Sequence, residues 1–174
     1  GKSSLLRILC GLLDPAEGEV HWQGQPSSAD PLAFRRAVGY LGHKLGLKER
    51  LTAAENVMLF VENAPSLSVD SQTASAETQK QAEWALERLG VLSLKNHLCE
   101  TLSAGQKQRV ALARLIAKKC AVWLLDEPFT AVDSVGITAL ESILADHVKK
   151  GGIVVLTSHQ AIELSGLKLQ TLRL

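Results

Sequence analysis

Apolar residues recur at the spacing of an amphipathic helix in two parts of the chain. The first run predicts a helix over residues 3–13 that Asp14-Pro15 ends, and the second predicts a helix over residues 134–150 that Gly151-Gly152 ends. The positions that define these two stripes are Leu5, Ile8, Leu9 and Leu12, and Ile137, Leu140, Ile143, Leu144 and Val148.

Two capping boxes mark the starts of further helices over residues 52–62 and 104–118. In each box a hydroxyl residue precedes a Glu or Gln by three positions, so each side chain can reach the other residue's backbone amide. Another helix is expected to end at Gly90, after a Ser- and Thr-rich mobile surface connection over residues 63–79. The capping pairs are Thr52 with Glu55 and Ser103 with Gln106.

Shorter apolar patterns predict strands. Continuous apolar runs at residues 121–125 and 153–156 favour parallel strands buried on both faces, joined through the intervening helix by a right-handed crossover. Residues 20–22 alternate as in a half-buried strand, and residues 38–41 form another strand candidate. In the tail, residues 167–174, the alternation slips phase, which favours a bulge or hairpin.

The composition indicates one globular domain without a broad electrostatic field. Apolar residues make up 46% of the 174 residues, and 19 basic against 18 acidic side chains leave a net charge of +1. That balance disfavours nucleic acid as a partner, and no apolar run approaches the roughly 20 residues that span a bilayer. Any membrane contact should therefore run through a partner protein. Cys10, Cys99 and Cys120 are expected to be buried, reduced thiols.

The chain opens on the closing half of a phosphate-binding loop, Gly1, Lys2, Ser3 and Ser4. Exposed amides at the helix start and the Lys2 ammonium suit phosphate oxygens, and the Ser3 hydroxyl suits magnesium. Because a Gly-Lys-Ser triplet also arises by chance, these residues alone leave both interpretations open. We expect the rest of the loop, with its earlier glycine and strand, upstream of Gly1.

Two adjacent carboxylates, Asp126 and Glu127, follow the first buried strand. A polar strand end is common, but open parallel sheets also place their ligands at this edge. Pro128 favours a defined turn that holds both carboxylates at one place. Asp126 suits association with bound magnesium, and Glu127 suits polarisation of a water that attacks a terminal phosphate.

A second anion site is possible where the helix over residues 104–118 begins. A hydroxyl and a glycine-bearing turn stand there beside exposed helix amides. A plain helix cap explains the same residues without any ligand. The residues are Ser103, Ala104, Gly105 and Gln106.

The order and spacing of these motifs resemble those of the ABC ATPases over nearly the whole chain. The resemblance implies an α/β fold of the P-loop NTPase, ABC ATPase type: a parallel core sheet flanked by helices, a helical signature subdomain over approximately residues 52–118, and a small antiparallel β part. It makes residues 1–174 one ABC ATPase domain without its N-terminal strands, with ATP and Mg²⁺ as cofactors. The motifs are Gly1 to Ser4, Leu102 to Gln106, Asp126-Glu127, Thr130 to Asp133 and Thr157 to His159.

The resemblance also implies roles for the residues of the phosphate site. Lys2 and Ser3, flanked by Gly1 and Ser4, correspond to the phosphate and magnesium ligands. Asp126 is similar to the magnesium-associated carboxylate and Glu127 to the general base. His159 resembles the switch histidine that contacts the terminal phosphate, although a lone histidine after a strand is more often a polar cap.

In ABC ATPases two subunits associate head to tail. The resemblance implies a homodimer in which Ser103, Ala104, Gly105 and Gln106 of one subunit close over the ATP of the other, with Asp133 at the seam. One position departs from the family, because His43, with Lys44 next, stands where a coupling glutamine is usual. A histidine can still donate or accept there, but the coupling role is then open.

Several less common features are similar to the ATPase subunit of the cytochrome c maturation, or haem exporter, system. They imply peripheral attachment to the cytoplasmic face of a bacterial inner membrane through integral membrane subunits. A soluble ABC ATPase of translation or DNA repair is the alternative, and it usually carries tandem units or long insertions that this chain lacks. The features are Val20 to Trp22, Gly39 to His43, Trp123 to Asp133 and Ser158 to Gln160.

Overall fold

The computed structural model describes residues 1–62, 71–130, 132–159, 167 and 169–172, and within this range the side chains of residue 62 and of residues 71–75 are not described. The chain divides into two compact units. The first unit comprises residues 1–43, 120–128 and 144–174, and the second comprises residues 44–119 and 129–143. None of the helices in the described part of the chain is both long and apolar enough to cross a membrane.

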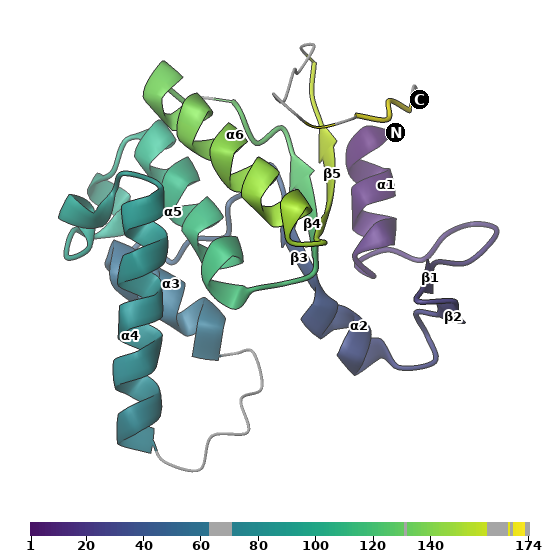
Figure 1. Ribbon diagram of the computed structural model, residues 1–174, viewed down its shortest axis with the longest axis horizontal. Helices are drawn as coiled ribbons and strands as arrows, with labels where there is room; N and C mark the ends of the chain where they lie inside the picture. The colour runs from purple at the N-terminus through teal and green to yellow at the C-terminus, as the bar shows by residue number, and fades with distance from the viewer. Residues whose placement is uncertain (63–70, 131, 160–166, 168, 173–174) are drawn as a thin grey trace. The chain divides into compact units, whose positions relative to one another are not determined.

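A parallel three-stranded sheet organises the first unit, with the strand order β3-β4-β5 (Figure 1). These strands are β3 (Val38–Leu41), β4 (Val122–Asp126) and β5 (Ile153–Thr157), which confirms the three predicted strand positions. Every residue of β4 is buried, as predicted for a strand between two neighbours. The same prediction is wrong for β5, because Ile153 is 48% exposed and only Thr157 is buried.

Helices α1 (Lys2–Leu9) and α2 (Pro31–Ala37) pack with this sheet around one apolar cluster. The predicted helix over residues 3–13 is too long, because the helical hydrogen bonding ends at Cys10 and Gly11 takes a φ of +71°. Leu12, assigned to the buried stripe, is therefore exposed. The buried members of the cluster are Leu6, Cys10, Phe34, Val38, Val122 and Leu124.

The pattern at residues 20–22 becomes a short hairpin of β1 (His21–Trp22) and β2 (Gln25–Pro26), paired antiparallel. Gln23 and Gly24 form the two-residue connection, and both have positive φ values, 53° and 79°. This conformation matches the twist of hairpin strands and is easy only for glycine and a few polar residues. The small antiparallel β part is thus confirmed.

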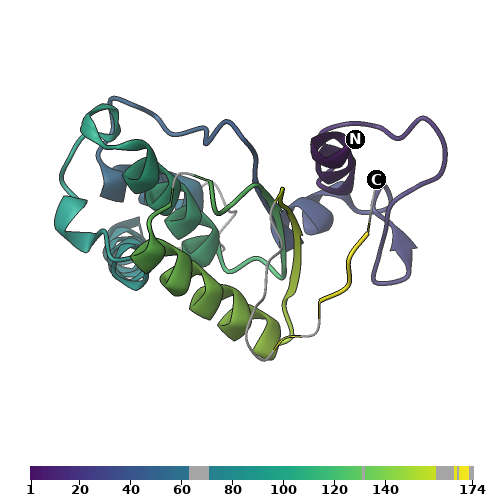
Figure 2. The same ribbon diagram turned by 90° about the horizontal axis from the view of Figure 1, so that it is seen from above.

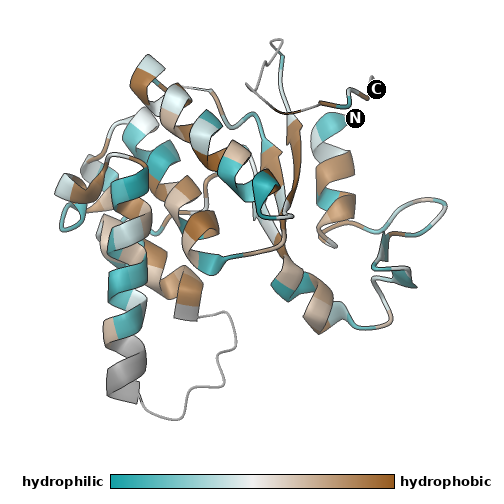
Figure 3. Cartoon of the chain, viewed as in Figure 1, coloured by the Kyte–Doolittle hydropathy of each residue, from teal (hydrophilic) through white to brown (hydrophobic). Residues whose placement is uncertain are grey.

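The second unit contains the start of α6 (Ser134–Lys149), up to Ile143, and three complete helices, α3 (Ala53–Glu62), α4 (Ser71–Arg88) and α5 (Ala104–Lys118) (Figure 2). Each of these three complete helices packs on the other two, and many contact positions hold alanine, which lets the helix axes approach closely. In Figure 3, α4 is mostly hydrophilic in colour, whereas the parallel strands β3, β4 and β5 are largely hydrophobic. The 3₁₀ turns Leu92–Leu94 and Cys99–Thr101 connect α4 to α5.

Both predicted capping boxes are confirmed. The Thr52 amide donates to the Glu55 carboxylate at 2.8 Å and the Glu55 amide donates to the Thr52 hydroxyl at 3.2 Å. The Thr52 amide, together with the Thr52 hydroxyl that donates to the same carboxylate at 3.0 Å, lowers the pKa of Glu55, since both bonds favour the charged carboxylate. The reciprocal bonds of Ser103 and Gln106 start α5 in the same way.

Helix α6 (Ser134–Lys149) confirms the second apolar stripe, with Leu140, Ile143 and Leu144 buried. The predicted connection over residues 63–79 is wrong from Ser71 onward, where α4 already runs, and residues 63–70 lie outside the described part. In the tail over residues 167–174, where a bulge or hairpin was expected, residues 168, 173 and 174 lie outside the described part, and the described residues are not assigned to a strand. The three cysteines are buried and free, as predicted.

Candidate active site

Helix α1 begins directly at the predicted phosphate site. Gly1 is its N-cap and no side chain caps the first turn, so the backbone amides there are not occupied by a side-chain acceptor. Lys2 and Ser3 are half-buried, and Ser4 is exposed. An uncapped helix start beside a lysine is suited to bind an anion, because its amides and partial positive charge face outward.

Asp126 and Thr157 meet at the ends of β4 and β5. They are register partners, and the Thr157 hydroxyl donates to Asp126 Oδ1 at 2.7 Å. The same hydroxyl oxygen accepts the Glu127 amide at 3.1 Å. One buried hydroxyl therefore fixes the carboxylate of one acidic residue and the backbone of the next.

Glu127 adopts an unusual backbone conformation, with a φ of +54°. For a residue with a Cβ, this left-handed conformation costs on the order of 1–2 kcal/mol, and such strain concentrates at functional sites. The turn takes the chain out of β4 and leaves Glu127 Oε1 buried, without a hydrogen-bond partner among the described residues. A buried carboxylate oxygen without a donor is poised to accept one.

His159 joins the two ends of the site. Its Nδ1 lies 3.3 Å from Lys2 Nζ, and its Nε2 lies 3.4 Å from Glu127 Oε1, which is within ion-pair distance but not aligned as a hydrogen bond. Because an ammonium only donates, Nδ1 accepts and Nε2 carries the ring proton toward Glu127. The start of α1 lies beside the end of β5, which brings together the two parts of the backbone that carry Lys2 and His159 (Figure 1).

Five residues of the first unit thus form one continuous polar chain, in which Glu127 meets His159 through its side chain and Thr157 through its backbone amide: Lys2, His159, Glu127, Thr157 and Asp126. The predicted site residue His43 is exposed at the end of the first stretch of the first unit, and no hydrogen bond or ion pair among the described residues connects it to this polar chain. Thr157 is the member that the sequence-based assignment of site residues omitted.

The remaining predicted residues belong to the second unit. The Ser103 hydroxyl accepts the Gln106 amide at 3.3 Å, and the Gln106 side chain accepts the Ser103 amide at 2.8 Å, so both are used in the helix cap. Ala104 is exposed and Gly105 half-buried in the first turn. Asp133 accepts the Gly136 amide at 2.9 Å and lies 3.9 Å from an Arg109 nitrogen.

Comparison with known proteins identifies the family to which the chain belongs. The family model described as ABC transporter matches residues 1–130. The chain belongs to the ABC transporter family. This confirms the predicted family and the α/β fold of the ABC ATPase type.

Related proteins place the chain more narrowly within this family. It is 42% identical over 168 residues to the cytochrome c biogenesis ATP-binding export protein CcmA of Saccharophagus degradans, covering 97% of this chain and 74% of the relative. The CcmA protein of Haemophilus influenzae is 40% identical over 169 residues, covering 97% and 75%. The chain therefore belongs with the CcmA proteins among ABC ATPases.

Solved structures agree with this placement. The ATP-binding cassette MJ0796, solved as a dimer in a post-hydrolysis state with ADP and Pi, is 30% identical with a TM-score of 0.81, over 92% of this chain and 70% of that one. A second dimeric structure of MJ0796 has a TM-score of 0.78 at 31% identity, over 90% and 69%. As an ABC ATPase, the chain is a nucleotide-binding, ATP-hydrolysing enzyme in a transport-coupled role, and the alternative in translation or DNA repair is not favoured.

Proposed function

We propose that this chain hydrolyses Mg-ATP at the polar chain of the first unit. The observation that supports the proposal is the contact of His159 with both Lys2 and Glu127, because it brings a phosphate-binding cation and a candidate base to one place. Lys2 and the uncapped amides of α1 bind the oxygens of the terminal phosphate. These contacts offset the negative charge of the phosphate as water approaches it.

Glu127 is the general base in this proposal. Its unpartnered Oε1 accepts a proton from a water whose oxygen attacks the terminal phosphorus, while the bond from that phosphorus to the ADP oxygen breaks and ADP leaves. Thr157 holds the Glu127 backbone, and His159 directs its Nε2 proton toward the Glu127 carboxylate or the terminal phosphate. Base and phosphate are thereby kept in one geometry through the reaction.

The donors at this site fit magnesium. A hydroxyl and a carboxylate, Ser3 and Asp126, are oxygen ligands of the kind Mg²⁺ takes together with waters and substrate phosphates, rather than in an all-protein cage. Bound magnesium would neutralise charge on the phosphates, with Ser3 and Asp126 holding it.

We further propose that the active form is a head-to-tail homodimer. Both MJ0796 structures are described as dimeric. In this chain the start of α5 would close over the ATP of the partner subunit, with the helical subdomain taken as approximately residues 52–118. Ser103, Ala104, Gly105 and Gln106 would contact that nucleotide, and Asp133 would lie at the seam.

The names of the CcmA relatives support a role in c-type cytochrome biogenesis, as haem export or haem-chaperone release. In this role the chain would attach to integral membrane subunits at the cytoplasmic face of a bacterial inner membrane. His43 would take the position of the coupling glutamine, with Lys44 next to it. Nucleic acid has no part in this proposal, in keeping with the net charge of +1.

The test compares Glu127→Gln with wild type in the full-length protein. We expect phosphate release to fall by about 10²–10⁴-fold, the usual contribution of a general base, while ATP binding persists and an ATP-bound dimer accumulates in light scattering after size exclusion. Glu87→Gln makes the same chemical change on the exposed side of α4 and should behave as wild type. Equal phosphate release from Glu127→Gln and wild type would reject the assignment.

A further inference from the structure

A buried arginine on α5, Arg114, binds the backbone of the segment that opens the second unit. Arg114 Nη2 donates to the Leu45 carbonyl at 2.6 Å and Nη1 donates to the Gly46 carbonyl at 2.9 Å. Its guanidinium carbon lies 4.7 Å from the centre of the Phe60 ring on α3. Only 9% of Arg114 is exposed, so these contacts form away from water.

The two carbonyls that Arg114 binds lie at the start of the second unit. The first stretch of the first unit ends at His43, the second unit begins at Lys44, and Leu45 and Gly46 follow at once. The second unit also ends its first stretch at Lys119, directly after α5. Arg114 therefore connects the entry segment of the second unit to the helix that precedes its exit.

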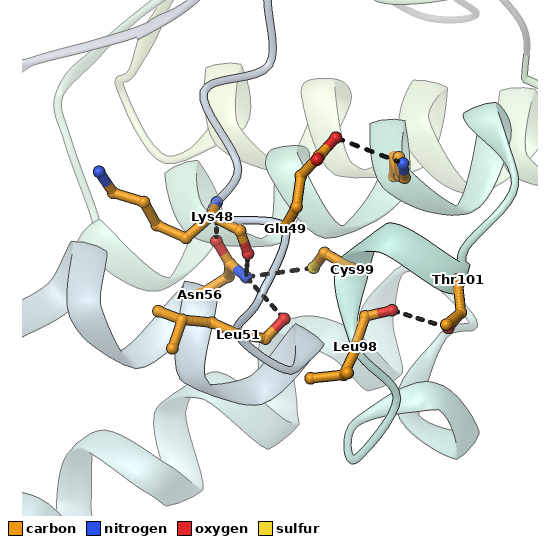
Figure 4. A network of polar contacts seen from close by, with 8 residues as sticks. Lys48, Glu49, Leu51, Asn56, Leu98, Cys99 and Thr101 are labelled. Carbon is orange, nitrogen blue, oxygen red and sulfur yellow. Dashed lines mark hydrogen bonds and ion pairs between the residues drawn. The ribbon is translucent and has the colours of Figure 1, made fainter.

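A second buried side chain continues the same attachment along the segment (Figure 4). Asn56 of α3 accepts the Lys48 amide at 2.8 Å and donates to the Lys48 and Leu51 carbonyls at 2.9 and 3.3 Å. Residues 45–51 are thus held by α5 at their start and by α3 at their end. The segment has to move with these two helices.

The free-energy cost of burying the Arg114 charge indicates that this residue has a role beyond packing. Burial lowers the pKa of its guanidinium, which reflects the cost of keeping the charge from water, and its Nε lacks a partner among the described residues. A well-packed apolar side chain of similar size often gives equal or higher stability at such a site. What arginine adds is a rigid fork that fixes two carbonyl oxygens at once.

We propose that Arg114 is a positioning residue that makes the segment after His43 and the helix that begins at Ser103 move as one body. The inference rests on the proposed function, because it matters for turnover only if Ser103 and its neighbours close over a nucleotide. A displacement of residues 44–46 is then passed through the guanidinium to α5 and so to its first turn. Arg114 itself touches no reacting atom.

The test uses Arg114→Met and Arg114→Lys in the full-length protein, with Lys118→Met as the matched control. Lys118 lies on the same helix over the same Phe60 ring, 5.7 Å from its centre, so its replacement removes the same charge nearby. For Arg114→Met we expect kcat for ATP to fall about tenfold or more, with the Kd for ATP within about twofold of wild type, because the phosphate ligands lie in the first unit. Arg114→Lys should be intermediate and Lys118→Met near wild type.

Hydrogen exchange separates positioning from general stability. The amide of Lys48, which donates to Asn56 Oδ1 at 2.8 Å, should lose protection in both Arg114 variants while the amides of α3 and α5 keep theirs. Unchanged kcat in a folded Arg114→Met protein would overturn the inference, as would an even loss of protection over α3, α5 and the segment. If Arg114→Met does not fold, Arg114→Lys decides by the same two readouts. Absence of ATPase activity in wild type would instead reject the proposed function. The exchange measurement would still test whether Arg114 holds the segment after His43 to α5.

Discussion

The Thr157 hydroxyl donates to Oδ1 of Asp126 at 2.7 Å, across the register pair that closes the β4–β5 ladder. Its oxygen also accepts the amide of Glu127 at 3.1 Å. A hydroxyl donates one proton and accepts with its lone pairs, so threonine can serve both neighbours simultaneously. The geometry of the two acidic residues therefore depends on a third residue on the adjacent strand.

Replacing Thr157 by valine keeps the shape and removes both hydrogen bonds. Because one of them goes to a buried carboxylate, we expect the free energy of unfolding to fall by about 2–4 kcal/mol, as measured by urea denaturation. We also expect a higher magnesium concentration at half-maximal ATPase activity, since Asp126 is no longer fixed. Thr157→Ser retains the hydroxyl and should recover most of both losses. A valine variant as stable as wild type would contradict the hydrogen-bond geometry.

Sequence reasoning could identify part of this site because some of its residues are local in sequence. Lys2 and Ser3 start a helix together, and Asp126 and Glu127 are adjacent, so no pairing register was needed. Thr157 is 31 residues beyond Asp126, and its role depends on which residues of β4 and β5 face each other. That register is set by packing of the whole strand, which a single sequence does not display.

The backbone of Glu127 predicts an unusual stability ranking among its substitutions. At a φ of +54°, glycine is unstrained, whereas alanine keeps the clash of its Cβ. We expect Glu127→Gly to be more stable than Glu127→Ala by about 1 kcal/mol in urea denaturation, even after the extra unfolded-state entropy of glycine. Both variants should lack ATPase activity. Alanine equal to or better than glycine would show that the turn is not strained.

The fold was predicted best where apolar spacing or a cap is explicit, and worst where polar residues form a helix. The stretch that begins α4 at Ser71 is rich in Ser, Thr and Gln, a composition shared by loops and by exposed helical turns. Helix α2 was not predicted, although Asp30 caps it by accepting the Ala33 amide at 2.9 Å and Pro31 is its first residue. That signal was present, but the helix is too short for a clear apolar stripe.

A half-buried histidine gives the stability of the first unit a pH dependence. His147 stacks on Trp123 with ring centres 3.9 Å apart and planes 10° apart, and its Nε2 lies 3.2 Å from the Ala121 carbonyl. Burial lowers the pKa of His147 below its usual 6.5, against backbone hydrogen bonds that raise it, and the charge of Lys150 lowers it further. The folded protein thus binds this proton less readily than the unfolded chain.

The sign of the effect follows from linkage. The stabilising contribution of neutral His147 is complete above pH 6.5 and is lost as the pH falls from there through the folded-state pKa. Its slope is limited to about 1.4 kcal/mol per pH unit, the value for one proton. His147→Phe keeps a stacked ring without the proton, so its unfolding free energy should fall less than that of wild type between pH 7 and pH 5. Identical slopes would exclude His147 as the group responsible, and Lys150→Met should give an intermediate slope.

Asn56 provides a stability test that is independent of nucleotide. The residue is 2% exposed, and its Nδ2, whose two protons are shared among several acceptors, also lies 3.0 Å from the Thr52 carbonyl oxygen and 3.1 Å from the Cys99 sulfur (Figure 4). Burial raises the pKa of the Cys99 thiol, in keeping with an apolar surrounding in which lost hydrogen bonds are costly.

Asn56→Ala leaves the amide and carbonyl groups of residues 48–52 without this partner. We expect the free energy of unfolding to drop by about 3 kcal/mol in urea denaturation, in the range for breaking a buried hydrogen-bond network. Asn56→Asp should be at least as damaging at pH 7, because a carboxylate would face the same carbonyl oxygens. The matched control is Thr101→Val in the same network, where an exposed hydroxyl donates to the Leu98 carbonyl at 2.8 Å and its loss should cost about 1 kcal/mol or less. Equal losses for Asn56→Ala and Thr101→Val would mean that residues 48–52 are not anchored through Asn56, and the attachment of the entry segment would then depend on Arg114 alone.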